Sequence, residues 1–211
     1  MAQCLVNRGV ASKAEVSEFL NPRLKLLADP FLIPNMDAAV ERLWKAREDN
    51  ERLLIYGDYD VDGVSSTALL TEMLTELGWT VQPYLPGRFD HGYGLSAVAL
   101  EKCLEKFDVD IVLAVDCGST AVEAIEFLNS KKVDVLVLDH HQVSVPPPEP
   151  LAMVNPQLSN DYPNFQELCS VGLAFKLAHA LVKRGRQEGL QKERDLDLKQ
   201  YLDLVALGTV A

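Results

Sequence analysis

The sequence predicts an α/β protein, with a parallel sheet flanked by helices on both faces in a three-layer, Rossmann-like domain. Three observations support this fold class. Short apolar runs recur at residues 52–56, 80–85, 110–115, 133–138 and 151–154. Such continuous runs are typical of strands that are buried on both faces. Segments with helical spacing of apolar residues separate most of them, and three of the runs end in acidic residues. Strand–helix alternation favours a parallel sheet.

The remaining elements follow from spacing and from punctuating residues. We expect helices over residues 36–50, 64–77, 96–106, 120–129 and 168–181, and a helical or turn segment over residues 201–210. Gly78 is positioned to end the second helix, and Gly172 is expected to break the fifth. Pro83 places its strand near an edge of the sheet, because proline cannot donate to a ladder. The charged stretch 183–199 is predicted to be solvated.

The first 35 residues are predicted to form a separate helical and extended segment packed on the core. Ser12 and Glu15 have the spacing of a capping box at a helix start. Asn21-Pro22, Asp29-Pro30 and Ile33-Pro34 then indicate turns. Residues 36–211 would form the main domain.

The amino-acid composition limits which classes of protein this chain can belong to. With 211 residues, 48% hydrophobic and 24% charged, the chain resembles a soluble globular protein with a substantial core. We expect no membrane partner, because no apolar run is long enough to cross a bilayer. Four scattered cysteines without a CxxC pair and the lack of a signal-peptide pattern favour a reducing, cytoplasmic location. A net charge of −11 counts against nucleic-acid binding, unless metals or a further segment supply positive charge.

An acidic cluster lies between the first strand and its following helix. Asp58, Asp60 and Asp62 alternate and are closed by Gly63. On extended backbone they would begin on one side, where their charges repel. A bound divalent cation would remove that conflict, and hard oxygen ligands suit Mg²⁺, Mn²⁺ or Ca²⁺. The simpler alternative is a polar turn with an aspartate helix cap.

Two further strands end in acids, which strengthens the metal hypothesis. Asp116 follows the third strand, and Asp139 with His140 follows the fourth. Ligands bind at the carboxyl ends of parallel strands, so we expect these groups to converge. A mixed oxygen and nitrogen set favours Mn²⁺, leaves zinc or iron open, and suffices for two ions about 3.5–4 Å apart.

Other residues beside this cluster have open roles. Ser65 and Ser66, at a predicted helix start, could hold a phosphate oxygen. His141 could be a base, a phosphate donor or an ordinary helix-start residue. For Cys117 we favour a small buried residue over a thiol nucleophile, because no dedicated base is near in sequence.

Three motifs resemble those of a known family. Asp58-Tyr59-Asp60-Val61-Asp62-Gly63, Val115-Asp116-Cys117-Gly118 and Leu138-Asp139-His140-His141 are similar to the first three motifs of the DHH phosphoesterase superfamily. Further stretches resemble its branch of single-strand-specific 5′→3′ DNA exonucleases, and the likeness covers essentially the whole chain. These stretches are residues 7–9, 29–32, 92–95, 154–156, 162–163, 171–177 and 203–211.

The resemblance implies roles for individual residues. Metal ligands would be Asp60, Asp62, Asp116 and His140, holding Mn²⁺ (or Mg²⁺), with two ions in the full-length protein. The catalytic group would be Asp58, which ligates or orients at the same site, and Asp139 and His141, with His141 facing the scissile phosphate. Arg88, Gly92, Tyr93 and Gly94 would lie along the strand-binding groove. The implied partners are single-stranded DNA, a single-strand-binding protein and a helicase, in DNA repair and recombination.

The sequence also departs from the family pattern. A fourth-motif aspartate is expected directly after the Gly-Thr-Val-Ala run, where this chain stops at Ala211. The family's DHHA1-type domain and OB-fold are also absent from this chain. The resemblance therefore implies an N-terminal, DHH-type fragment that is weakly active or inactive alone, with basic surface elsewhere in the protein.

Two alternative functions stay open. One is another DHH phosphoesterase, such as an oligoribonuclease, a pyrophosphatase or a cyclic-dinucleotide phosphodiesterase. Those relatives usually carry a histidine where this chain has Tyr56, which favours the DNA exonuclease branch. The other is a non-catalytic DHH-fold binding protein, which the intact first three motifs disfavour. A dinucleotide-binding domain is disfavoured because no GxGxxG follows the first strand.

Overall fold

A five-stranded, wholly parallel sheet forms the centre of the protein, as predicted. The computed structural model describes residues 2–87, 94–162 and 165–211. Its strands are β1 (Arg52–Gly57), β2 (Thr80–Tyr84), β3 (Ile111–Val115), β4 (Asp134–Leu138) and β5 (Ala152–Val154). They lie in the order β2-β1-β3-β4-β5, and every pairing is parallel. The strand that contains Pro83 lies at an edge, as its proline predicted.

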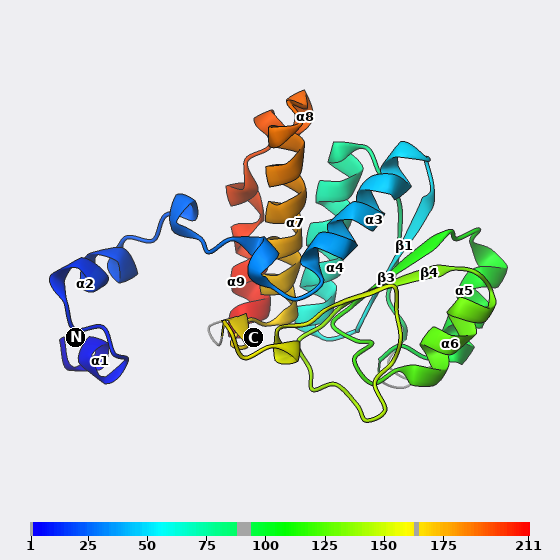
Figure 1. Ribbon diagram of the computed structural model, residues 1–211, viewed down its shortest axis with the longest axis horizontal. Coiled ribbons are helices and arrows are strands. Elements are labelled where there is room, and N and C mark those ends of the chain that lie inside the picture. The colour runs from blue at the N-terminus through cyan, green and yellow to red at the C-terminus, as the bar shows by residue number, and fades with distance from the viewer. Residues whose placement is uncertain (1, 88–93, 163–164) are drawn as a thin grey trace.

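Helices cover both faces of the sheet (Figure 1). The helices are α3 (Met36–Glu48), α4 (Val61–Leu77), α5 (Ala97–Lys106), α6 (Val122–Ser130), α7 (Ser170–Gln187) and α9 (Leu202–Val210). Alternate strand residues divide between two cores, as parallel strands buried on both faces require. Leu53 and Ile55 join the larger core with α3, α4 and α7, whereas Leu54 and Tyr56 join the smaller core with α5 and α6.

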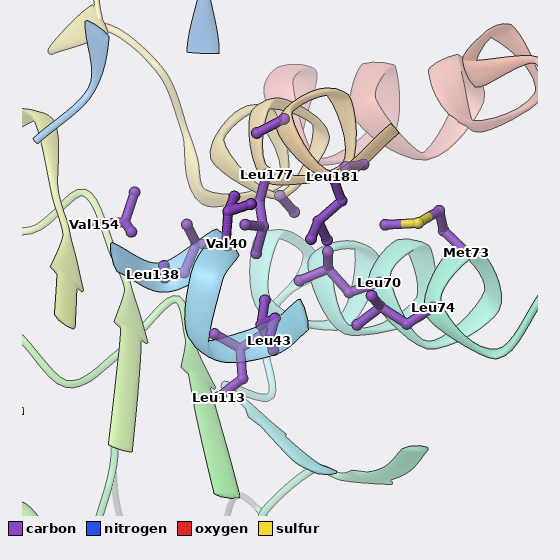
Figure 2. Packing of buried hydrophobic residues seen from close by; sticks show 14 of the residues in the cluster. Val40, Leu43, Leu70, Met73, Leu74, Leu113, Leu138, Val154, Leu177 and Leu181 are labelled. Atoms are coloured by element: carbon purple, nitrogen blue, oxygen red, sulfur yellow. The ribbon is translucent and has the colours of Figure 1, made fainter. Parts of the chain in front are cut away.

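The larger core is continuous from the sheet to the outer helices (Figure 2). Leu43 on α3, Leu70 and Leu74 on α4, and Leu181 on α7 are all fully buried in it beside Leu113 of β3. Protein interiors are close-packed, so these buried side chains hold α4 and α7 against each other. Because the first turns of α4 and α7 carry site residues, this packing positions the site.

The chain reverses its direction of travel across the sheet at β1. After β1 it runs to β2 on one side, and then returns to β3 on the other side. The carboxyl ends of β1 and β3 therefore flank a topological switch point, which is where open α/β sheets bind ligands. Asp58 and Asp116 are the first residues after these two strands.

The structure corrects three expectations about local elements. Helix α4 begins at Val61, not at residue 64. Gly172 does not break α7, which runs unbroken from Ser170; this glycine lies in the first turn against Leu168. The charged stretch 183–199 is not simply solvated, because Glu193 in α8 (Gln191–Asp195) is 1% exposed and pairs with Arg47 at 2.5 Å.

The N-terminal segment packs on the core only in its last part. Helices α1 (Ala2–Asn7) and α2 (Lys13–Leu20) stand away from the body (Figure 1), and α2 has no buried residue. Ser12 and Glu15 do form the expected capping box. Contact with the core is made around Ile33, which is 1% exposed. Among the described helices, none is both long and apolar enough to cross a membrane.

Candidate metal centre

Three loops that follow β1, β3 and β4 carry the predicted site residues to one edge of the sheet. In the first loop, β1 ends at Gly57, so the three aspartates do not alternate along a strand. Instead Asp60 is the N-cap of α4 and its Oδ1 accepts a hydrogen bond from Gly63 N at 2.9 Å. Asp62 lies in the first turn of the helix. Convergence therefore arises from the strand-to-helix turn and not from strand pleating.

Gly63 is required by this turn. A Cβ at this position would lie 2.5 Å from the carbonyl oxygen of Asp58 and 2.8 Å from its backbone nitrogen. Backbone atoms cannot move aside as a flexible side chain can, so only glycine allows α4 to start so close to Asp58. The lack of space for a side chain therefore explains why a glycine closes the acidic motif.

Asp62, Asp116 and His140 meet at the centre of the site. His140 Nε2 lies 3.5 Å from Asp116 Oδ1 and 3.8 Å from Asp62 Oδ2. The three side chains come from α4 and from the loops after β3 and β4. Asp116 is 3% exposed and has a φ of 62°, a left-handed conformation that aspartate and asparagine adopt more readily than most residues.

The N-terminus of α7 adds donors that the sequence analysis did not identify. Asp62 accepts from Ser170 N and Val171 N, both at 2.7 Å, and Ser170 Oγ donates to Asp116 Oδ1 at 2.6 Å. A helix N-terminus has free N–H groups and a partial positive charge, so it suits a carboxylate. The only local signal was a serine near the start of a predicted helix; its partners lie more than 50 residues away in sequence.

A second group of hydrogen bonds surrounds Asp139. Its Oδ1 accepts from His140 N at 2.8 Å and contacts His141 Nδ1 at 2.7 Å, while Oδ2 accepts from Ser119 N at 3.0 Å. Asn155 donates to both Ser119 Oγ and the carbonyl oxygen of His141. Asp139 therefore orients His141, whose ring is more than half exposed.

The buried acids of the site titrate differently. Burial raises the pKa of Asp116, and hydrogen bonds from His140 and Ser170 offset this only in part. Burial likewise raises the pKa of Asp58. For Asp139, burial alone would raise the pKa, but hydrogen bonds from His141 and Ser119 outweigh it and lower the value to about 2.

The neighbouring carboxylates raise the pKa of both histidines. The hydrogen bond with Asp139 raises the pKa of His141 to about 9, and the hydrogen bond with Asp116 raises the pKa of His140. Burial raises the pKa of the Cys117 thiol well above its usual value, which agrees with a buried residue and not with a nucleophile.

A pocket of about 360 Å³ opens beside the acids. Asp58, Asp116, Asp139 and His141 line one part of it, and Gly94 and Leu95 line another. The carbonyl oxygen of Gly94 accepts a hydrogen bond from Tyr56 Oη at 3.2 Å. Five sequence-predicted residues therefore share one cavity, in which anionic and cationic groups face the same space.

Other predicted residues are placed differently. Ser65 and Ser66 are 2% and 0% exposed, and Ser66 Oγ donates to the carbonyl oxygen of Asp62, so both side chains are buried. That this helix start holds a phosphate stays a prediction. Asp60 caps α4 and is exposed, and its charge is close enough to the central group to raise the pKa of Asp116. Arg88, Gly92 and Tyr93 lie outside the described residues.

The donor set fits a divalent cation. Asp116, His140 and His141 each offer one ligand atom, and these atoms lie within 4.8 Å of one another. Asp62 lies beside them, and two carboxylates with imidazole nitrogens match the mixed preference of Mn²⁺. Burial disfavours the ionised form of Asp116, and a cation bound beside it would favour that form again.

Comparisons with known proteins agree with the three motifs. The family described as "DHH family, N-terminal domain" matches residues 52–209. The chain is 39% identical to the single-stranded-DNA-specific exonuclease RecJ of Haemophilus influenzae, covering 91% of this chain and 34% of that protein. It is 36% identical to RecJ of Bacillus subtilis, covering 100% of this chain and 25% of that protein. The chain thus spans about a quarter to a third of the length of these relatives.

A solved structure shows the same fold. RecJ of Thermus thermophilus in complex with Mn²⁺ matches with a TM-score of 0.75 and 32% identity, over 98% of this chain and 27% of that one. The α/β architecture is therefore shared, and that relative binds the metal that the mixed donor set of this chain predicts.

Proposed function

Since the chain belongs to the DHH family, we propose that it is the metal-binding part of a metal-dependent exonuclease that hydrolyses single-stranded DNA. The observation that carries this proposal is the convergence of Asp62, Asp116 and His140 from three separate loops. The relatives named single-stranded-DNA-specific exonuclease, and the relative bound to Mn²⁺, support the substrate and the cofactor.

Asp60, Asp62, Asp116 and His140 would hold Mn²⁺ or Mg²⁺, with two ions in the complete protein. A cation held there would supply Lewis-acid chemistry, which neutralises phosphate charge and lowers the pKa of a bound water. The α7 N-terminus holds Asp62 with two N–H groups, and Ser170 holds Asp116, so the chain prepares both carboxylates in advance. Preorganised ligands of this kind do not need to rearrange when the cation binds.

Asp139 and His141 would act on the phosphate. Asp139 would keep the imidazole of His141 oriented through its contact with Nδ1, and in the metal-free chain it raises the pKa of His141 to about 9. An imidazole N–H of His141 that faces the pocket would suit a phosphodiester oxygen in which charge develops. Asp58, on the same pocket wall, would ligate or orient at the site.

The direction and the partners belong to the proposal as well. We propose cleavage in the 5′→3′ direction, in DNA repair and recombination, with a single-strand-binding protein and a helicase as partners. A chain with a net charge of −11 has little electrostatic attraction for DNA, so bound cations and further parts of the protein would supply it. We therefore expect the 211-residue chain alone to be weakly active or inactive.

A digestion assay tests the function. The chain, and a longer protein that continues beyond residue 211, are incubated with Mn²⁺ and single strands labelled at either end. The proposal predicts that the longer protein releases mononucleotides from the 5′ end of single strands and spares duplexes, pyrophosphate and dinucleotides. Release from the 3′ end would overturn the direction, and cleavage of dinucleotides alone would favour another DHH phosphoesterase.

Variants identify the residues responsible. Asp62→Ala should abolish hydrolysis by the longer protein. The matched control is Asp108→Ala, because Asp108 is an exposed acid that pairs with Arg52 away from the site. Full hydrolysis by Asp62→Ala would contradict the proposal and would leave a non-metal mechanism or a contaminating nuclease.

A further inference from the structure

Ser170 lies between two of the proposed metal ligands and belongs to none of the acidic motifs. It is the first residue of α7 and is fully buried. Its backbone N–H donates to Asp62 Oδ2 at 2.7 Å, and its hydroxyl donates to Asp116 Oδ1 at 2.6 Å. One residue thus joins a carboxylate from the loop after β1 to a carboxylate from the loop after β3.

The two contacts depend on different parts of Ser170. The N–H group of a first helical residue has no partner within its own helix, so almost any residue here could donate to Asp62. Val171 N makes the equivalent contact to Asp62 Oδ1. Only a side-chain donor can reach Asp116. The hydroxyl is therefore the part of Ser170 that is specific to the site.

The hydroxyl fixes the rotation of the Asp116 carboxylate. The same oxygen, Oδ1, lies 3.5 Å from His140 Nε2, and that nitrogen is 3.8 Å from Asp62 Oδ2. Ser170 Oγ thus holds Oδ1 on the side of the site where the other two groups lie. A hydrogen bond from a neutral hydroxyl to a carboxylate is directional and short, so it orients the buried side chain that accepts it.

We propose that Ser170 is a positioning residue whose hydroxyl holds Asp116 beside Asp62 and His140, so that the affinity for a divalent cation depends on it. The proposal rests on the proposed function, because it takes these three side chains as metal ligands. Groups that orient the ligands of metal sites typically change metal affinity by about 10- to 100-fold when they are removed.

An isosteric pair of variants isolates the hydroxyl. Ser170→Thr and Ser170→Val add the same methyl bulk, and only the first keeps a hydroxyl; both keep the N–H that donates to Asp62. Mn²⁺ alone is titrated into each metal-free protein by calorimetry. We expect Ser170→Thr to bind at least about 10-fold more tightly than Ser170→Val. Ser170→Ala, which adds no bulk, should match Ser170→Val.

The control is Thr71→Val, which removes a buried hydroxyl that has no hydrogen-bond partner, about 13 Å along α4 from Asp62. It should leave Mn²⁺ affinity unchanged. Circular dichroism in EDTA verifies that each variant is folded before titration. In the longer protein, the Mn²⁺ concentration for half-maximal hydrolysis should rise by the same factor in Ser170→Val, and kcat at saturating Mn²⁺ should return to within a few-fold.

Equal affinity of the Thr and Val variants overturns the positioning role and leaves the proposed function intact, as long as the wild-type chain binds Mn²⁺. Failure of both the wild-type chain and the longer protein to bind Mn²⁺ overturns both. If only the longer protein binds Mn²⁺, the Thr and Val variants are compared in that protein. Loss of kcat that high Mn²⁺ does not restore also contradicts the positioning role, because it would place Ser170 in the chemistry itself.

Discussion

Asp116 and Asp139 occupy equivalent positions at the ends of neighbouring parallel strands, yet their surroundings shift the pKa of the two carboxyl groups in opposite directions. Both are nearly fully buried, at 3% and 1% exposed. Asp139 accepts hydrogen bonds from Ser119, His140 and His141, which lower its pKa to about 2. Asp116 has fewer donors, and burial raises its pKa.

The comparison teaches that burial alone does not decide what a carboxylate does; its donors do. Asp139 is satisfied by protein groups, so it suits a structural role in orienting His141. Asp116 is left with negative charge that the protein compensates only in part, so it suits a cation. On this ground we propose that two aspartates that look alike in sequence differ in role: Asp139 positions His141, and Asp116 binds the metal.

The largest effect expected from this comparison is the loss of metal binding in Asp116→Asn. Because a ligand itself is removed, Mn²⁺ affinity should fall more than about 100-fold by calorimetry. The metal-free protein should be no less stable, since the neutral amide relieves the burial of a charge and asparagine tolerates the positive φ. A large loss of stability with retained affinity would reverse the assignment of the two acids.

Asp139→Asn should reduce the stability of the protein more, and its Mn²⁺ affinity less, than Asp116→Asn does. The lowered pKa means that the ionised carboxylate stabilises the fold above pH 3.8, and that this stability is lost as the pH falls through about 2. A shift of this size corresponds to roughly 2–3 kcal/mol at neutral pH. Urea unfolding in EDTA should show that the free energy of unfolding falls by about this amount. Mn²⁺ affinity should fall about 10-fold, which is less than in Asp116→Asn. Unchanged stability would refute the structural role.

The His141 titration sharpens the same contrast. Its pKa is raised to about 9 by Asp139, so its charge stabilises the fold below pH 6.5, and this contribution is lost as the pH rises through about 9. NMR of the imidazole signals in EDTA should place its pKa well above 6.5. Asp139→Asn should return it toward that ordinary value, whereas Asp116→Asn should change it less. An unchanged pKa of His141 in Asp139→Asn would show that Asp139 does not cause the shift.

The smallest effect is expected at Gly208 on α9. An added methyl group would lie 3.1 Å from Asp62 Oδ1 and 2.8 Å from Val171 Cγ1. Gly208→Ala should therefore shift Asp62 slightly and reduce Mn²⁺ affinity a few-fold, with a stability loss of about 1 kcal/mol. Thermal unfolding and calorimetry measure both quantities. An unchanged affinity would show that α9 does not restrain Asp62.

Local sequence patterns predicted the parallel sheet, the edge position of the strand with Pro83, and the meeting of acids at one edge. These three features can be predicted because each is recognised from a short segment: a continuous apolar run, a proline within a strand, and an acid at the carboxyl end of a strand. The strand alternation invoked for Asp58, Asp60 and Asp62 was wrong, since a turn and a helix start follow Gly57. The sequence analysis thus placed these acids at one edge of the sheet for an incorrect local reason.

Contacts between distant segments could not be predicted. Nothing near Ser170 in sequence indicates that it reaches Asp62 and Asp116, and nothing near Glu193 indicates burial against Arg47. The burial of Ser65 and Ser66 could not be predicted for the same reason, because helix position alone does not show which face packs against a neighbour. Hydrogen-bond partners fixed by tertiary packing require the structure.

Anomalous diffraction at the manganese edge, from crystals of the chain soaked in Mn²⁺, tests the central claim most directly. We predict a peak within bonding distance of the Asp116 carboxylate and His140 Nε2, and beside Asp62. A manganese peak elsewhere, with these three side chains bound only to each other and to water, would contradict it.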